Sequence, residues 1–483
     1  MRLLGICVGA VVVAACTGNT PPEATYAVTV TSLAPPQFAI RAELPLTDDT
    51  LRVAQSWPCD LDVLCRGGWP ALITDLRVTD AHGRALRTDS LGRRGWVVRD
   101  RHAGRVVVEY AVSHLLLAQN DWPAPRETAY ADSAMLFTLG RALFVGTTAA
   151  GPIRVRFVVP PGVHVSAAWL RDTADGGSGA FTVPGFEALV DNGIVFRHER
   201  SMRIRAGQFS MELALFGRWS ERRDLVTRLM GAHLTSFTRL LGFDEPGAYL
   251  AVFLDDPDMG GESFLSTHAL SASPDSAVVR WGRLIGHEVF HYWNGHRIRG
   301  ADYTSSQWFQ EGMTEYYAIL SMARNGFITP AAALDELSRN LRAHREFGRS
   351  LAASGNRKNR GFYASATMVA FVLDVLIRDA TDGRRSLDDL MRQMWITFGR
   401  PGRPYTQAEV FALAGAMAGR DLDAFFQQHV EGDRPLPLDS VLPLAGLTLA
   451  RNAAGEEMIV ADGNAPPGRR ELWRALIAAR PPR

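Results

Sequence analysis

The stretch "HEVFHYWNGHRIRG", residues 287–300, places two histidines four positions apart, with a glutamate directly after the first. In an α-helix, positions i and i+4 lie on one face, so His287 and His291 can reach a single metal ion. Glu288 then projects beside them, toward a water molecule on that ion. A random chain of this composition contains such a string roughly once in a hundred trials. The surrounding residues therefore decide whether this is a zinc-binding helix or an accident of composition.

A third ligand is available in the next helical segment, "WFQEGMTEYY", residues 308–317. Catalytic zinc takes three protein ligands and keeps one position for water. Glu311 can approach from this second helix, whereas two ordinary surface glutamates would fit poorly among the four aromatic residues around them. Glu315, one turn later, is a candidate for orienting a ligand. The sequence thus predicts one zinc ion per chain with three ligands and a general base: His287, His291 and Glu311 as ligands, and Glu288 as the base.

Helical spacing continues on both sides of this pair, with a recognisable start or stop signal in each segment. The helices are expected within residues 221–242, 273–295, 305–326, 329–348, 362–383, 386–399 and 406–419, with a buried strand at 248–256.

The first half of the chain reads as strands instead. Short β-branched or aromatic runs recur between turn signals such as "DAHGR". They are found at residues 26–31, 38–44, 105–112, 153–159, 202–207 and 210–217. This pattern predicts an all-β region of sandwich type.

The N-terminus, "MRLLGICVGAVVVAAC", has a positive Arg2, an apolar run and then small residues, as in a secretory signal. Cys16 directly follows Val-Ala-Ala, which resembles a bacterial lipobox, in which the cysteine thiol receives a diacylglycerol. An ordinary signal peptide that happens to contain a cysteine is the alternative. The lipobox interpretation predicts a protein anchored at the bacterial cell envelope, on the periplasmic side, and Thr17 is compatible with the outer membrane.

Composition excludes some functions and leaves others open. The formal net charge of +1 gives no reason to expect a nucleic acid partner. Lys358 is the only lysine, which we interpret as codon bias without a function. Cys59 and Cys65 could form a small disulfide loop in an oxidising compartment, or could be buried free thiols.

The chain resembles the glycyl aminopeptidase family of zinc metallopeptidases, family sixty-one of the usual peptidase classification, in the gluzincin group with thermolysin and the alanyl aminopeptidases. The resemblance rests on "HEVFHYWNGHRIR", "EGMTEYY", the segment 362–392 and "LAGLTL", with "ITDLRVTDAHGRAL", "WVV" and "VVVEYAV" upstream. It covers most of the mature chain. It implies an α+β, multidomain fold: an N-terminal β-sandwich-like domain followed by a thermolysin-like, mostly helical zinc peptidase domain.

The corresponding division has six parts. They are a lipoprotein signal (1–15), a tether (16–26), the β domain (27–219), the catalytic domain (220–400), a C-terminal helical part (401–447) and a short tail (448–483).

The resemblance also implies residue roles. Tyr363 would donate a hydrogen bond to the developing oxyanion. Glu262, in "MGGES", would hold the free α-amine of a substrate, while Gly261 would let the substrate backbone approach closely. Three features depart from the family. "MGGES" replaces a "GGLEH"-like segment, Tyr363 lacks the lysine and glycine that usually follow it, and too few residues follow "LAGLTL" for the usual PDZ domain.

These observations predict a metallopeptidase, of the aminopeptidase kind, with a peptide substrate. A zinc endopeptidase, a non-catalytic envelope binding protein that keeps the fold, and a structural zinc site are the alternatives. The intact Glu288 argues against a binding protein, and a structural site would need a fourth protein ligand. The sequence leaves the natural substrate, the preferred side chain and the oligomeric state undetermined.

Overall fold

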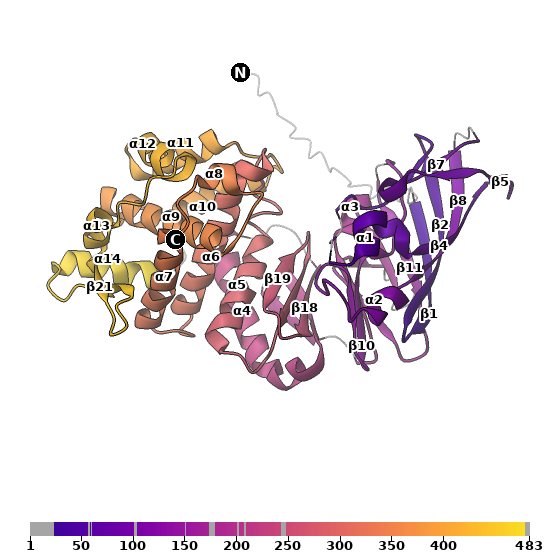
Figure 1. Cartoon of the computed structure of the whole chain (residues 1–483), viewed down its shortest axis with the longest axis horizontal. Coiled ribbons are helices and arrows are strands. Elements are labelled where there is room, and N and C mark those ends of the chain that lie inside the picture. Colours follow the sequence, from indigo (N-terminus) through magenta and orange to yellow (C-terminus); the bar gives the residue numbers. More distant parts are fainter. Residues whose placement is uncertain are drawn as a thin grey trace, which may run out of the picture.

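The computed structural model of the chain describes residues 24–478, except 57, 59, 101–103, 150, 173–178, 200–201, 207–208 and 243–247. A strand-rich domain lies beside a mostly helical one, and a five-stranded sheet lies between them (Figure 1). The predicted α+β fold, with a β-sandwich-like domain before a helical domain, is confirmed. Cys16 and the predicted signal peptide lie outside the described residues.

The strand-rich domain is a sandwich of a large and a small sheet around a shared core. In β2 (Pro36–Leu46) every second residue is buried, because successive side chains of a strand point to opposite faces. Across the eight-stranded sheet the order is β13 (Leu170–Arg171), β14 (Ala180–Val183), β11 (Ile153–Val158), β1 (Ala24–Leu33), β2, β8 (Gly104–Ser113), β4 (Ile73–Asp80) and β5 (Ala85–Leu86). A three-stranded sheet adds β3 (Thr50–Arg52), β7 (Gly95–Val98) and β6 (Thr88–Ser90).

The small sheet is buried on both faces, which is why β15 (Gly193–Arg197) is buried along its whole length. Ile194 and Phe196 point into the sandwich core. Val195, between them, packs with Leu250 of the neighbouring sheet. The sheet runs in the order β12 (His164–Ala167), β15, β10 (Met135–Leu139) and β9 (Ala129–Ala131). Its outer face thus joins the two domains.

The five-stranded sheet supports the helical domain. One face packs on the small sheet. The other packs on helices α4 (Arg223–Leu241) and α5 (Val278–His291) through residues such as Tyr249 and Phe253. Its order is β16 (Met202–Ala206), β17 (Phe209–Leu215), β18 (Ala248–Asp255), β20 (Thr267–Ala272) and β19 (Gly260–Ser263). β19 pairs antiparallel with β20 and forms one edge of the sheet.

The helices that build the second domain are α4 (Arg223–Leu241), α5 (Val278–His291), α6 (Tyr303–Arg324), α7 (Pro330–Arg345), α8 (Leu351–Ser354), α9 (Arg360–Ala380), α10 (Leu387–Met394), α11 (Gln407–Ala418), α12 (Asp423–Phe426), α13 (Leu438–Val441) and α14 (Pro467–Ile477). Three short helices lie in the strand-rich domain: α1 (Asp62–Gly67), α2 (Leu115–Gln119) and α3 (Phe186–Val190). α9 is long and apolar enough to cross a membrane by composition, but 83% of its apolar window is buried. It is the core helix of the domain.

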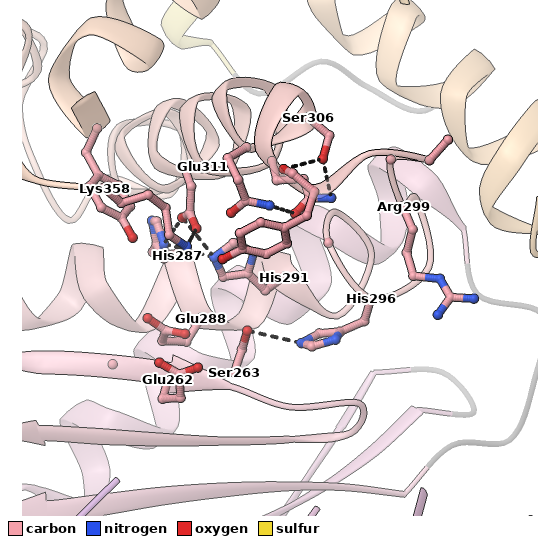
Figure 2. A pocket seen from close by; sticks show the side chains of 18 residues that line it. Glu262, Ser263, His287, Glu288, His291, His296, Arg299, Ser306, Glu311 and Lys358 are labelled. Atoms are coloured by element: carbon pink, nitrogen blue, oxygen red, sulfur yellow. Dashed lines mark hydrogen bonds and ion pairs between the residues drawn. The ribbon is translucent and has the colours of Figure 1, made fainter. Parts of the chain in front are cut away.

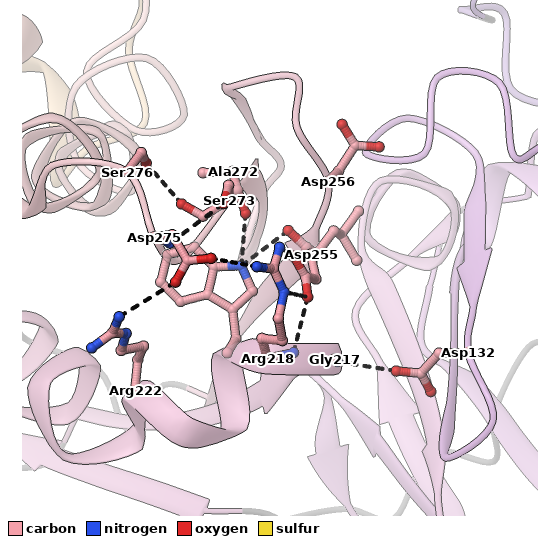
Figure 3. Close-up of polar contacts among 12 residues, drawn as sticks. Asp132, Gly217, Arg218, Arg222, Asp255, Asp256, Ala272, Ser273, Asp275 and Ser276 are labelled. Atoms are coloured by element: carbon pink, nitrogen blue, oxygen red, sulfur yellow. Dashed lines mark hydrogen bonds and ion pairs between the residues drawn. The ribbon is translucent and has the colours of Figure 1, made fainter.

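A polar junction fixes the chain where it passes from one domain to the other (Figure 3). The backbone N–H of Gly217 donates to Asp132 of the first domain at 3.1 Å. The guanidinium of Arg218 binds both carboxylate oxygens of Asp255, at 2.8 and 2.9 Å. The indole of Trp219, fully buried, donates to the carbonyl of Leu254 at 3.0 Å. The start of the helical domain is therefore tied to the carboxyl end of β18.

The structure differs from the predicted division at three places. β16 and β17 lie within the range assigned to the β domain, 27–219, but pair into the sheet of the helical domain. β1 begins at Ala24, inside the predicted tether. The segment 448–483 is not a mere tail, because its described residues contribute most of the hairpin β21 (Leu447–Arg451) and β22 (Glu457–Ala461), followed by α14.

Candidate active site and metal centre

Helix α5 presents both predicted histidines on its buried face (Figure 2). The Nε2 atoms of His287 and His291 lie 3.0 Å apart. Their neighbour Glu288 is also buried, although glutamate is rarely found inside a protein without a partner or a role. The spacing of one helical turn therefore brings the two rings together as the sequence predicts.

Helix α6 brings Glu311 to the same point. The helix begins after Asp302, whose carboxylate accepts from the backbone N–H of Ser305 at 2.7 Å. From there, the Oε2 atom of Glu311 lies 3.4 Å from the Nε2 atoms of both His287 and His291. The cap thus sets the start of the helix that supplies the third side chain.

The outer nitrogen of each histidine has an acceptor. The Nδ1 of His287 lies 2.9 Å from a carboxylate oxygen of Glu315, whose other oxygen pairs with Arg283. The Nδ1 of His291 lies 2.9 Å from the carbonyl oxygen of Asn294. Since carboxylates and carbonyls only accept, each Nδ1–H donates, and in the neutral, metal-binding form of each ring Nε2 keeps a lone pair. Both lone pairs point to the space between the rings and Glu311.

These three atoms fit a metal ion. The ligand atoms of His287, His291 and Glu311 lie within 4.8 Å of one another, and all three residues are buried. Glu311 Oε2 has no hydrogen-bond partner in the described structure, and facing lone pairs repel one another unless a cation lies between them. Two imidazoles and one carboxylate are the donor set of catalytic zinc, with the fourth position left for water. Within the described residues, this group contains three side chains, as in a catalytic rather than a closed structural site.

The edge strand β19 passes beside Glu288 and carries Glu262 (Figure 2). Gly261 of this strand lies directly against the Glu288 carboxylate. Burial raises the pKa of Glu288 to about 8, while His291 acts in the opposite direction. Burial, together with the charge of Glu127, raises the pKa of Glu262 to about 7.

Tyr363 enters from the first turn of α9. Its ring centroid lies 6.1 Å from that of His287, and its side chain lines the same cavity. Burial and the nearby carboxylates, Glu311 first among them, raise the pKa of the phenol. The hydroxyl therefore keeps its proton and can donate a hydrogen bond.

A cavity of about 460 Å³ joins these groups. Its lining includes the residues predicted to act in catalysis, metal binding and substrate binding, namely Gly261, Glu262, His287, Glu288, His291, Glu311 and Tyr363. Glu315 lies behind the metal centre, against His287. The remaining lining is mostly polar.

Two basic residues at the site were not predicted. Lys358, to which no function was assigned, places its Nζ 2.6 Å from Glu311 Oε1. Arg126, from the strand-rich domain, binds the hydroxyl of Ser271 in β20 and reaches the carbonyl of Asp258 at 3.5 Å. The one sequence signal for Lys358 was that it is the only lysine of the chain. No sequence feature marked Arg126.

The predicted disulfide lies away from this site. Cys65, in α1, is disulfide-bonded. Cys59 lies outside the described residues, so its pairing with Cys65 stays a prediction.

Each of the two domains contains a segment that matches a model of a known protein family. Residues 67–196 match the model of the peptidase M61 N-terminal domain, and residues 280–368 match that of the M61 glycyl aminopeptidase. Both segments are thus similar to M61 peptidases, and the family resemblance seen in the sequence is confirmed. The chain is a zinc peptidase, a hydrolase.

Solved structures of other enzymes share the fold. The aminopeptidase N family protein from Idiomarina loihiensis is 19% identical with a TM-score of 0.73, over 89% of this chain and 79% of that one. The M1 zinc metallopeptidase from Deinococcus radiodurans is 17% identical with a TM-score of 0.56, over 86% of this chain and 94% of that one. Yeast LTA4 hydrolase in complex with bestatin is 12% identical with a TM-score of 0.52, over 86% of this chain and 68% of that one. No curated protein matches the chain in sequence.

Proposed function

We propose that this protein is a zinc-dependent aminopeptidase that removes N-terminal residues from peptides. The observation that carries the proposal is the convergence of three buried lone-pair atoms beside a buried glutamate, in a cavity bounded by an edge strand. His287, His291 and Glu311 would hold one zinc ion. Zinc bound there supplies a Lewis acid that polarises a carbonyl and activates water.

Three side chains of the cavity and its surroundings have a part in the proposed reaction. Glu288, beside the ligands, takes a proton from the attacking water and returns it to the leaving amine. Tyr363 donates a hydrogen bond to the oxygen on which negative charge develops. Glu315 fixes the ring of His287, because it accepts from Nδ1 at 2.9 Å.

The exopeptidase character depends on Glu262. Its carboxylate lies on the edge strand, in the same cavity as Glu288. An extended peptide can pair with such an edge, and a carboxylate next to its first residue can bind the α-ammonium group. The neighbours give this proposal support by analogy, since one was solved with a Tyr-Ser-Ala substrate and others with single amino acids. An endopeptidase would not need a carboxylate at this position.

We also propose that the enzyme is anchored at the cell envelope through a lipid on Cys16. The support is the order of charged, apolar and small residues before that cysteine. Peptides outside the cytoplasm would then be its substrates.

Replacement of the general base tests the catalytic proposal. Glu288→Gln keeps the size of the side chain but cannot accept the proton, so we expect a loss of about a hundredfold or more in kcat. Zinc content and the melting temperature should not change. Glu471→Gln is the matched control, because Glu471 is mostly exposed and pairs with Arg474 far from the cavity. Full activity in Glu288→Gln would contradict the assigned role.

A further inference from the structure

We propose that Lys358, the only lysine of the chain, is a positioning residue for the metal ligand Glu311. It binds Oε1 and so leaves Oε2 as the single oxygen that faces the histidines. This inference rests on the zinc site of the proposed function. It concerns a residue to which sequence comparison and composition give no role.

The two oxygens of Glu311 have different surroundings. Oε1 lies 2.6 Å from the ammonium of Lys358. Oε2 lies 3.4 Å from each histidine Nε2 and has no hydrogen-bond partner within the described structure. A free carboxylate can bind a metal through one oxygen or through both. With Oε1 held in a charge-assisted hydrogen bond, Glu311 can offer Oε2 alone.

The backbone around Lys358 is fixed on both sides. A Cβ added at Gly355 would lie 2.0 Å from the carbonyl oxygen of Thr304, so this loop packs closely on the first turn of α6. At the other end, Asn359 caps α9 by accepting from the backbone N–H of Phe362 at 3.0 Å. Lys358 therefore bridges the helix that carries Glu311 and the helix that carries Tyr363.

The burial of the Glu311 carboxylate distinguishes this pair from an ordinary surface ion pair. The side chain of Lys358 is 27% exposed, and that of Glu311 is 6% exposed. Exposed pairs contribute little because water and salt screen them, whereas the acceptor of this pair is a buried carboxylate in the lining of the cavity. The ammonium also lies 6.0 Å from the ring centroids of Tyr303 and Tyr363, which flank it. The side chain thus has few alternative positions.

The test uses the full chain with cobalt(II) in place of zinc, because the visible absorption of cobalt(II) reports its coordination number. Lys358→Met removes the ammonium and frees Glu311 to bind through both oxygens. We expect a weaker absorption band and a fall of about tenfold or more in kcat with little change in KM. Lys358→Arg, which keeps the charge, should restore both. Arg357→Met removes the adjacent exposed cation and should behave as wild type.

Each outcome decides for or against the proposal. Loss of cobalt binding by Lys358→Met, with unchanged circular dichroism and rescue by Lys358→Arg, would support it. An unchanged spectrum and kcat in Lys358→Met would overturn it. The proposal would also be overturned if Lys358→Arg failed to restore either the cobalt absorption band or kcat. This second variant keeps the proposal testable even if Lys358→Met does not fold. If the wild type itself binds no cobalt, the proposed zinc site fails instead.

Discussion

Gly261 lies so close to Glu288 that a Cβ at position 261 would be 2.2 Å from the Glu288 Oε1 atom. The strand that we propose receives the substrate and the carboxylate that we propose acts as the general base are therefore in direct contact. The sequence suggests that a glycine here leaves room for a substrate backbone. The structure shows that it also leaves room for the Glu288 carboxylate.

Gly261→Ala should reduce kcat by about a hundredfold or more, since the added methyl group must displace the general base. The metal ligands are untouched, so zinc content should stay at one per chain. Gly463→Ala is the matched control, because a Cβ at Gly463 would meet nothing within 4 Å. Steady-state kinetics and metal analysis together check the prediction, and near-normal turnover in Gly261→Ala would contradict the placement of Glu288.

The metal centre should depend on its ligands and on the carboxylate behind them. His291→Ala should lose most of the bound zinc. Glu315→Gln, which weakens the acceptor for His287 Nδ1, should lower zinc affinity by about 10-fold to 100-fold. Titration with a chelator measures both changes, and equal affinity in wild type and Glu315→Gln would show that Glu315 does not act on the metal site.

The stability of the strand-rich domain should depend on pH through His114. This residue is fully buried, its ring packs edge-on against Phe38 at 5.3 Å, and burial lowers its pKa to about 4. In the unfolded chain the imidazole of His114 binds a proton below about pH 6.5, whereas in the folded chain burial keeps it neutral until about pH 4. The free energy of unfolding should therefore fall as the pH drops from 6.5 toward 4, by about 3 kcal/mol from this residue.

Urea denaturation at several pH values checks this contribution. His114→Phe removes the titrating group and should flatten the dependence between pH 6.5 and 4. His82→Phe, at an exposed turn, should leave it unchanged. The prediction is wrong if the two variants show the same pH dependence.

The proposed lipid anchor is a separate prediction. Mass spectrometry of the mature protein should find an acylated N-terminal Cys16, and Cys16→Ser should release the protein from the membrane fraction. A mature N-terminus at another residue would exclude the lipobox interpretation.

Local spacing predicted which three candidate ligands lie together. His287 and His291 share one helical face, and Glu311 lies on the next helix, so helix geometry alone places all three in reach. Lys358 could not be found in this way, because its contact with Glu311 spans 47 positions and is made from a loop. The contact of Arg126 spans even more of the sequence, because this residue binds Ser271 of β20 across the domain junction, 145 positions away.

Strand partners were harder to predict than strands. The sequence marks residues 202–217 as strands, but their alternation does not say which sheet they join. The hairpin of β21 and β22 was missed because its strands are short and only partly buried. Its attachment to α7, where Ile459 N–H donates to Ser338 at 2.9 Å, is a tertiary contact that no local pattern encodes.

The measurement that tests the central claim most directly compares one peptide with a free N-terminus and its N-acetylated form. Wild type should release the first residue of the free peptide only, and a chelator should abolish this release until zinc is restored. Glu262→Ala should mainly reduce turnover of the free peptide, because it removes the partner of the α-ammonium group, a bond that contributes about 1.5–3 kcal/mol. Equal cleavage of the free and acetylated peptides by wild type would contradict the aminopeptidase assignment.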